Sequence, residues 1–109
     1  MLIVSDMANE IVLCTYRTRP DKEPEFKALL SRHWATLREL GFVTEVEPVV
    51  LRELGEPTYV ELFTWVDGGF DQAHEHPDVL ALWEAMDPLL EDRDGRPKWE
   101  FPHFEPVRF

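Results

Sequence analysis

Cysteine and long apolar runs are both scarce in this chain of 109 residues. A single cysteine, Cys14, cannot form an internal disulfide. No apolar run approaches the roughly 20 residues needed to cross a bilayer. The opening stretch, MLIVSDMANE, lacks the basic segment and the full apolar segment of a signal peptide. We therefore expect a cytoplasmic protein without a membrane anchor.

Basic residues are also scarce: 11 Lys and Arg stand against 22 Asp and Glu, a formal net charge of −11. A field of this sign repels phosphate backbones and anionic lipid headgroups, so we expect neither nucleic acid nor a membrane surface as partner. The hydrophobic fraction of 44% is typical of a globular protein. We expect a loose arm over residues 1–9 and one domain over residues 10–109.

The hydrophobic patterns alternate between strand and helix in the order β-α-β-β-α-β. The predicted elements are strands over 11–18, 42–53, 58–66 and 99–109, and helices over 20–40 and 70–90. We expect the second helix to break at His76-Pro77. This order predicts an α+β, ferredoxin-like fold: a four-stranded antiparallel sheet in the order 4-1-3-2, with two helices on one face. Pro48, Pro102 and Pro106 support it, because they fall in the two edge strands.

The strand over 58–66 is predicted to lie in the centre of the sheet. Its residues alternate between two sets, which are Tyr59, Glu61, Phe63 and Trp65 against Val60, Leu62, Thr64 and Val66. Both sets are mostly apolar, so both faces need a cover. Helices cover one face. The simplest cover for the other is a second copy of the same sheet, so we expect a homodimer.

The first helix carries a histidine within its apolar stripe. The stripe consists of Phe26, Leu29, Leu30, His33, Leu37 and Leu40. His33 is either a core histidine hydrogen-bonded to a backbone carbonyl or a member of a functional site. Both interpretations stay open at this point.

The segments YVELFTW and DGGFDQAHEHPDVLALWEAM resemble the dimeric α+β barrel superfamily and, within it, the antibiotic-biosynthesis-monooxygenase-like domains. The resemblance spans residues 10–107 and implies a pocket between the sheet and the helices of each subunit. If Trp65 faces that pocket, strand parity brings Tyr59, Glu61 and Phe63 into the same cleft, facing the stripe that holds His33.

The heme-degrading branch of this family uses an Asn on the first strand, a Trp at the end of the third and a His on the second helix. Only the Trp has a counterpart, Trp65. The first-strand position falls nearest Cys14 and the helix position near Trp83. We therefore expect no heme, flavin or metal. Other enzymes of the family oxidise quinol-like or polycyclic aromatic substrates without a cofactor, and the resemblance implies a small aromatic ligand.

For such an enzyme, His33 or Glu61 is the candidate catalytic base. The candidate substrate-binding residues are Cys14, Tyr59, Phe63, Trp65 and Trp83. The alternative is a non-catalytic dimeric domain that binds a ligand or is only structural, with these aromatics as ordinary core. His74 and His76 are possible additional site residues. Because they point about 200° apart on a helix, they do not chelate one metal ion together unless Pro77 distorts the turn.

Overall fold

The sheet has the strand order that the sequence predicts. The computed structural model describes residues 10–109, so the predicted arm over residues 1–9 lies outside the described part. At the centre, β1 (Glu10–Arg17) and β3 (Thr58–Trp65) pair antiparallel. The outer strands are β2 (Val49–Arg52), which pairs with β3, and β4 (Trp99–Glu100) and β5 (His103–Phe104), which pair with β1. This ferredoxin-like α+β arrangement confirms the order 4-1-3-2, with the last strand in two pieces.

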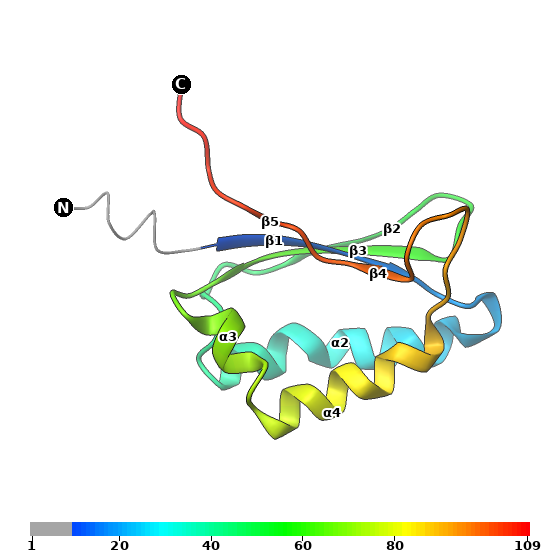
Figure 1. Ribbon diagram of the computed structural model, residues 1–109, viewed down its shortest axis with the longest axis horizontal. Coiled ribbons are helices and arrows are strands. Elements are labelled where there is room, and N and C mark those ends of the chain that lie inside the picture. The colour runs from blue at the N-terminus through cyan, green and yellow to red at the C-terminus, as the bar shows by residue number, and fades with distance from the viewer. Residues whose placement is uncertain (1–9) are drawn as a thin grey trace.

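The helices lie together on one side of the sheet (Figure 1). A 3₁₀ turn over Pro20–Lys22 leads into α2 (Glu23–Glu39). Pro24 stands in the first turn of α2, where its missing N–H costs no helical hydrogen bond. The second predicted helix is divided at the expected place into α3 (Gly69–Ala73) and α4 (Pro77–Met86). None of the helices in residues 10–109 is long and apolar enough to cross a membrane.

Two predicted strands are shorter in the structure. The pattern over 42–53 predicts one strand, but β2 covers only Val49–Arg52. Before β2, the chain pairs with β3 only at the isolated Val43–Trp65 bridge. Regular pairing starts after Pro48, because proline has no N–H to donate to a neighbouring strand. The strand predicted over 99–109 is reduced to β4 and β5, because Pro102 separates the two pairs of ladder residues.

A tight turn with little free space joins β3 to α3. Gly68 has φ +76°, a conformation that favours glycine. Gly69 lies so close to the backbone carbonyl of Phe42 that a Cβ would collide with it. The turn places Phe70 against Trp65, with ring centroids 5.5 Å apart. It thereby fixes one end of the space between the sheet and the helices.

Strand pairing sorts the residues of the sheet into two faces. On the helix side, Cys14 pairs with Glu61, Val12 with Phe63 and Tyr16 with Tyr59, and all six side chains are buried. The opposite side, called the open face below, carries Ile11, Leu13, Val49, Leu51, Val60, Leu62 and Phe104. All of these are half-buried or exposed. The apolar alternation of β3 therefore has a helix cover on one side and no cover within residues 10–109 on the other.

Candidate functional site

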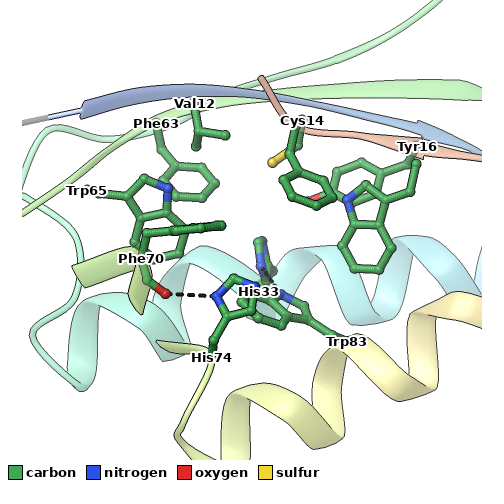
Figure 2. Close-up of a pocket in the computed structure, with 11 residues that line it drawn as sticks. Val12, Cys14, Tyr16, His33, Phe63, Trp65, Phe70, His74 and Trp83 are labelled. Carbon is green, nitrogen blue, oxygen red and sulfur yellow. Dashed lines mark hydrogen bonds between the residues drawn. The ribbon is translucent and has the colours of Figure 1, made fainter. Parts of the chain in front are cut away.

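A cavity of about 260 Å³ lies between the sheet and the helices. Figure 2 shows side chains from the two layers pointing toward one another across it. The sheet contributes Val12, Cys14, Tyr16, Phe63 and Trp65, the helix layer contributes His33, Phe70, His74 and Trp83, and the last segment adds Trp99 and Phe101. Apart from Val12 and Cys14, every residue of this lining has an aromatic or imidazole ring. Such walls suit a flat, mostly apolar ligand.

A chain of hydrogen bonds runs along one wall of this cavity. Trp83 Nε1 lies 2.9 Å from His33 Nε2, and His33 Nδ1 lies 2.8 Å from Glu61 Oε1. The hydroxyl of Tyr16 donates to the same carboxylate oxygen at 2.7 Å. An indole nitrogen can only donate a hydrogen bond, so His33 Nε2 must be the acceptor and carries a lone pair. The proton of the ring is therefore on Nδ1, which donates a hydrogen bond to Glu61. His33 is therefore a neutral ring with a fixed tautomer, and its contact with Glu61 is a hydrogen bond rather than an ion pair.

Glu61 is a fully buried carboxyl group in the middle of the sheet. It lies there because its register position on β3, opposite Cys14, faces the helices. Its Oε1 accepts two hydrogen bonds, whereas Oε2 is buried with no partner among residues 10–109. A buried polar atom without a partner loses its hydration and gains nothing in return. Only one of the two oxygens of this carboxylate is therefore satisfied, by Tyr16 of the sheet and His33 of the helix layer.

Burial and the neighbouring carboxylate keep two other groups protonated. Burial, followed by the charge of Glu61, raises the pKa of Tyr16 well above its ordinary value of 10.0. The same two causes raise the pKa of Cys14 from 9.0 to about 12. Tyr16 is therefore a hydrogen-bond donor at neutral pH. Cys14 is a thiol rather than a nucleophilic thiolate.

Two indole N–H groups of the cavity lining are left without partners. Trp65 Nε1 and Trp99 Nε1 are buried and bond to nothing within the described residues. Trp65 packs against Phe70, whereas the ring of Trp99 lies 5.5 Å from that of Tyr16. Figure 2 shows Trp65 and Tyr16 at opposite ends of the cavity. The lining therefore includes, near each end of the cavity, a tryptophan whose indole N–H has no partner within the described residues.

Most of the residues predicted for the site meet at this cavity. Its lining includes His33, Cys14, Phe63, Trp65, Trp83 and His74. Glu61 does not line it but reaches it through its bonds to His33 and Tyr16. The ring of His74 is oriented by a 2.8 Å hydrogen bond from Nδ1 to the carbonyl oxygen of Phe70, the dashed line in Figure 2.

Tyr59 and His76 lie away from this cavity. Tyr59 shares the face of Glu61 but lies two positions away from it, which is about 7 Å along a strand. Its hydroxyl donates to Glu23 Oε1 at 2.7 Å, at the start of α2. His76 caps α4, accepting the backbone N–H of Asp78. The sequence predicts that Tyr59 shares the cleft of His33, but in the structure Tyr59 lines a different cavity. The reason is that strand alternation specifies the face on which a side chain lies but not where a helix crosses that face.

Sequence reasoning missed Tyr16, Phe70, Trp99 and Phe101. A signal existed for Tyr16, because it has the same strand parity as Cys14 and is opposite Tyr59. Trp99 and Phe101 come from a segment whose register depends on pairing across the sheet. Within residues 10–109, no three His, Cys, Asp or Glu side chains gather so as to hold a metal ion.

No protein-family model and no curated protein matches this chain. Solved structures share its fold. SnoaB, a cofactor-independent oxygenase from Streptomyces nogalater, aligns with a TM-score of 0.75 at 19% identity, covering 94% of this chain and 96% of SnoaB. Rv0793 from Mycobacterium tuberculosis gives 0.74 at 15% identity, covering 93% and 97%. An antibiotic biosynthesis monooxygenase gives 0.74 at 11%, covering 91% and 99%. The chain therefore shares its ferredoxin-like α+β fold with solved structures that include a cofactor-independent oxygenase and an antibiotic biosynthesis monooxygenase.

Proposed function

We propose that this protein binds a small flat aromatic molecule in the 260 Å³ cavity and oxidises it with O₂ as a cofactor-independent monooxygenase. The observation that carries the proposal is the His33–Glu61 pair in the wall of a cavity lined by rings. A neutral imidazole whose tautomer is fixed by a carboxylate is suited to accept a proton. The fold shared with SnoaB, a cofactor-independent oxygenase, is consistent with this chemistry.

The proposed base is the Nε2 atom of His33. A substrate hydroxyl, which in an anthrone is that of its enol tautomer, takes the place of the Trp83 N–H at this atom and transfers its proton to it. Glu61, which accepts the hydrogen bond from Nδ1, stabilises the imidazolium that forms. The deprotonated, electron-rich ring then reduces O₂. For the ring methylene of an anthrone, the balance is CH₂ + O₂ → C=O + H₂O, so one oxygen atom enters the product and the other leaves as water.

The two indole donors give the proposed site its selectivity. Trp65 and Trp99 each have a buried N–H without a partner in residues 10–109, and a carbonyl oxygen of the ligand supplies the missing acceptor. The apolar rings around them exclude water from the reactive intermediate. We therefore propose a neutral ligand with a hydroxyl group and with carbonyl or similar acceptor oxygens at its ends.

One observation favours the non-catalytic alternative. Both ring nitrogens of His33 already have partners, as expected for a histidine that only stabilises the core. In this alternative the cavity binds an aromatic molecule, but Trp83 never leaves His33. No proton transfer takes place.

Anthrone oxidation, followed by O₂ consumption, distinguishes the two functions. His33→Leu should keep the fold and should bind anthrone, measured by tryptophan fluorescence, but should lose about 100-fold or more in turnover. His74→Gln changes the other histidine of the same cavity and serves as the control, with turnover close to wild type. Loss in His74→Gln alone would assign the base to His74. Binding of anthrone without turnover by the native protein would establish the non-catalytic alternative.

We further propose that the working unit is a homodimer in which two open faces pack together. The support is the row of aliphatic side chains across β2, β3 and β1, which includes Leu13, Leu51 and Leu62. A protein of this size rarely leaves such a continuous patch in water. An interface of standard size buries about 1,600 Å², and a sheet face fits this scale.

A further inference from the structure

A second cavity lies on the other side of Glu61. It measures about 340 Å³ and lies between α2 and the strands β2 and β3, with Trp34, Val50 and Glu61 in its walls. His33 and Tyr16 line the first cavity and not this one, whereas Glu61 lines this one and not the first. The carboxyl group of Glu61 therefore separates the two cavities.

Two buried polar atoms belong to side chains of this second cavity and have no partner within residues 10–109. They are Glu61 Oε2 and Trp34 Nε1. Because Glu61 Oε1 already accepts from Tyr16 and His33, Oε2 is the atom left for another donor. The indole N–H of Trp34 needs an acceptor. A bound molecule that donates to one atom and accepts from the other removes both desolvation penalties.

A hydroxyl group meets both needs with a single oxygen, since it has one proton to donate and two lone pairs. An ammonium group can donate to Glu61 but cannot accept from Trp34, and Lys27, which also lines the cavity, repels it. An anion is repelled by Glu61 itself. The remaining walls include Leu30, Pro48 and the ring of Tyr59, which suit an apolar body.

We propose that this cavity is a second binding site, for a small neutral alcohol with an apolar or aromatic body, whose hydroxyl is held between Glu61 and Trp34. The site does not depend on catalysis in the first cavity, because Glu61 and Trp34 line the second cavity and not the first. Its ligand bonds to the same carboxylate that holds His33.

Three probes with the same ring test the chemistry: benzyl alcohol, benzylamine and toluene. The chain has four tryptophans, so its indole N–H signals can be assigned by Trp→Phe variants in proton–nitrogen NMR spectra. Benzyl alcohol should shift the Trp34 signal in a saturable manner. Toluene and benzylamine should bind about fivefold or more weakly, because neither satisfies both atoms.

Two variants locate the binding. Trp34→Phe keeps an aromatic wall but removes the N–H. It should weaken the binding of benzyl alcohol about fivefold without changing that of toluene, both followed by the backbone N–H signals in the same spectra. Val50→Phe, at a half-exposed position of the edge strand, should fill the cavity and abolish the Trp34 response while Trp65 and Trp99 still respond to anthrone. Equal binding of toluene and benzyl alcohol, tighter binding of benzylamine, or an alcohol response confined to Trp65, Trp83 and Trp99 would overturn the proposal. So would the absence of any response.

Discussion

The two faces of the β1–β3 pair differ in how their polar and apolar residues are used. The helix face buries a carboxylate, a phenol and a thiol, on Glu61, Tyr16 and Cys14. The open face carries aliphatic side chains such as Leu13 and Leu62, which remain partly exposed. A buried polar group on the first face is possible because α2 supplies a donor to it. Within residues 10–109 the second face has no helix over it, and its central side chains are aliphatic, with the Arg17–Glu100 ion pair at one end. We therefore propose a ligand for the first face and a protein partner for the second.

The largest effect is expected on the open face. Leu62→Glu places a charge in the middle of the proposed dimer interface, and its desolvation should raise the dissociation constant of the dimer about 100-fold or more, or unfold the chain. Leu54→Glu makes the same change at a side chain that is 96% exposed in the β2–β3 hairpin, and should leave the dimer intact. Mass measurements by light scattering at several concentrations test both. A stable native monomer would contradict the dimer.

Strand alternation predicted the difference between the faces because it depends only on local geometry. The positions of Pro48 and Pro102 likewise identified the edge strands, since proline cannot donate to a ladder. The same prolines shorten β2 and divide the last strand into two pieces. The hydrophobic pattern alone does not predict this shortening. Pattern shows which residues are apolar, whereas ladder length depends on hydrogen bonds with a partner strand.

For the candidate site too, the face on which a residue lies was predictable from the sequence, whereas the position of the cavity was not. His33 and Glu61 were expected to face each other because the family resemblance implied that Trp65 faces the helices and strand parity puts Glu61 on the same face. They lie 2.8 Å apart. The cavity itself, and the roles of Tyr16 and Trp99 in its lining, depend on where elements far apart in the chain cross. Sequence spacing holds no information on that crossing point, which also explains why Tyr59 lies in the second cavity instead.

The next largest effect is expected at the centre of the helix face. Glu61→Leu removes the acceptor of two buried donors, the Tyr16 hydroxyl and the His33 Nδ1–H, and should lower the free energy of unfolding by about 2–4 kcal/mol. Glu61→Gln retains one acceptor oxygen and should cost about 1 kcal/mol. Urea unfolding at a fixed protein concentration compares the two variants. If Glu61→Leu is as stable as the native chain, the polar network does not hold the helix face together.

A smaller effect is expected at Trp83, where a substitution should lower stability but raise turnover. Trp83→Phe removes one hydrogen bond to His33 and should cost about 1 kcal/mol of unfolding free energy. The same change frees His33 Nε2 for a substrate hydroxyl, so kcat/KM for anthrone should rise about fivefold if His33 is the base. Urea unfolding and O₂ consumption measure the two quantities. Lower stability together with lower turnover would show that Trp83 supports the site rather than competes with its substrate.

The smallest effect is expected where the helix face reaches solvent, at Glu23. Hydrogen bonds from Arg52 and then Tyr59 lower the pKa of the Glu23 carboxyl from 4.5 to about 2. A carboxyl whose pKa is lower in the folded state stabilises the fold above pH 4.5, and this contribution is lost as the pH falls from 4.5 toward 2. The ion pair is partly exposed, so the loss should be only about 1 kcal/mol.

The measurement is the difference in unfolding free energy between the native chain and Glu23→Gln at pH 6 and at pH 2.5, with Glu25→Gln as an exposed control in the same turn. The difference should shrink at the lower pH for Glu23→Gln, and by more than it does for Glu25→Gln. An equal change with pH in both variants would mean that the Arg52–Glu23 pair makes no specific contribution to the unfolding free energy.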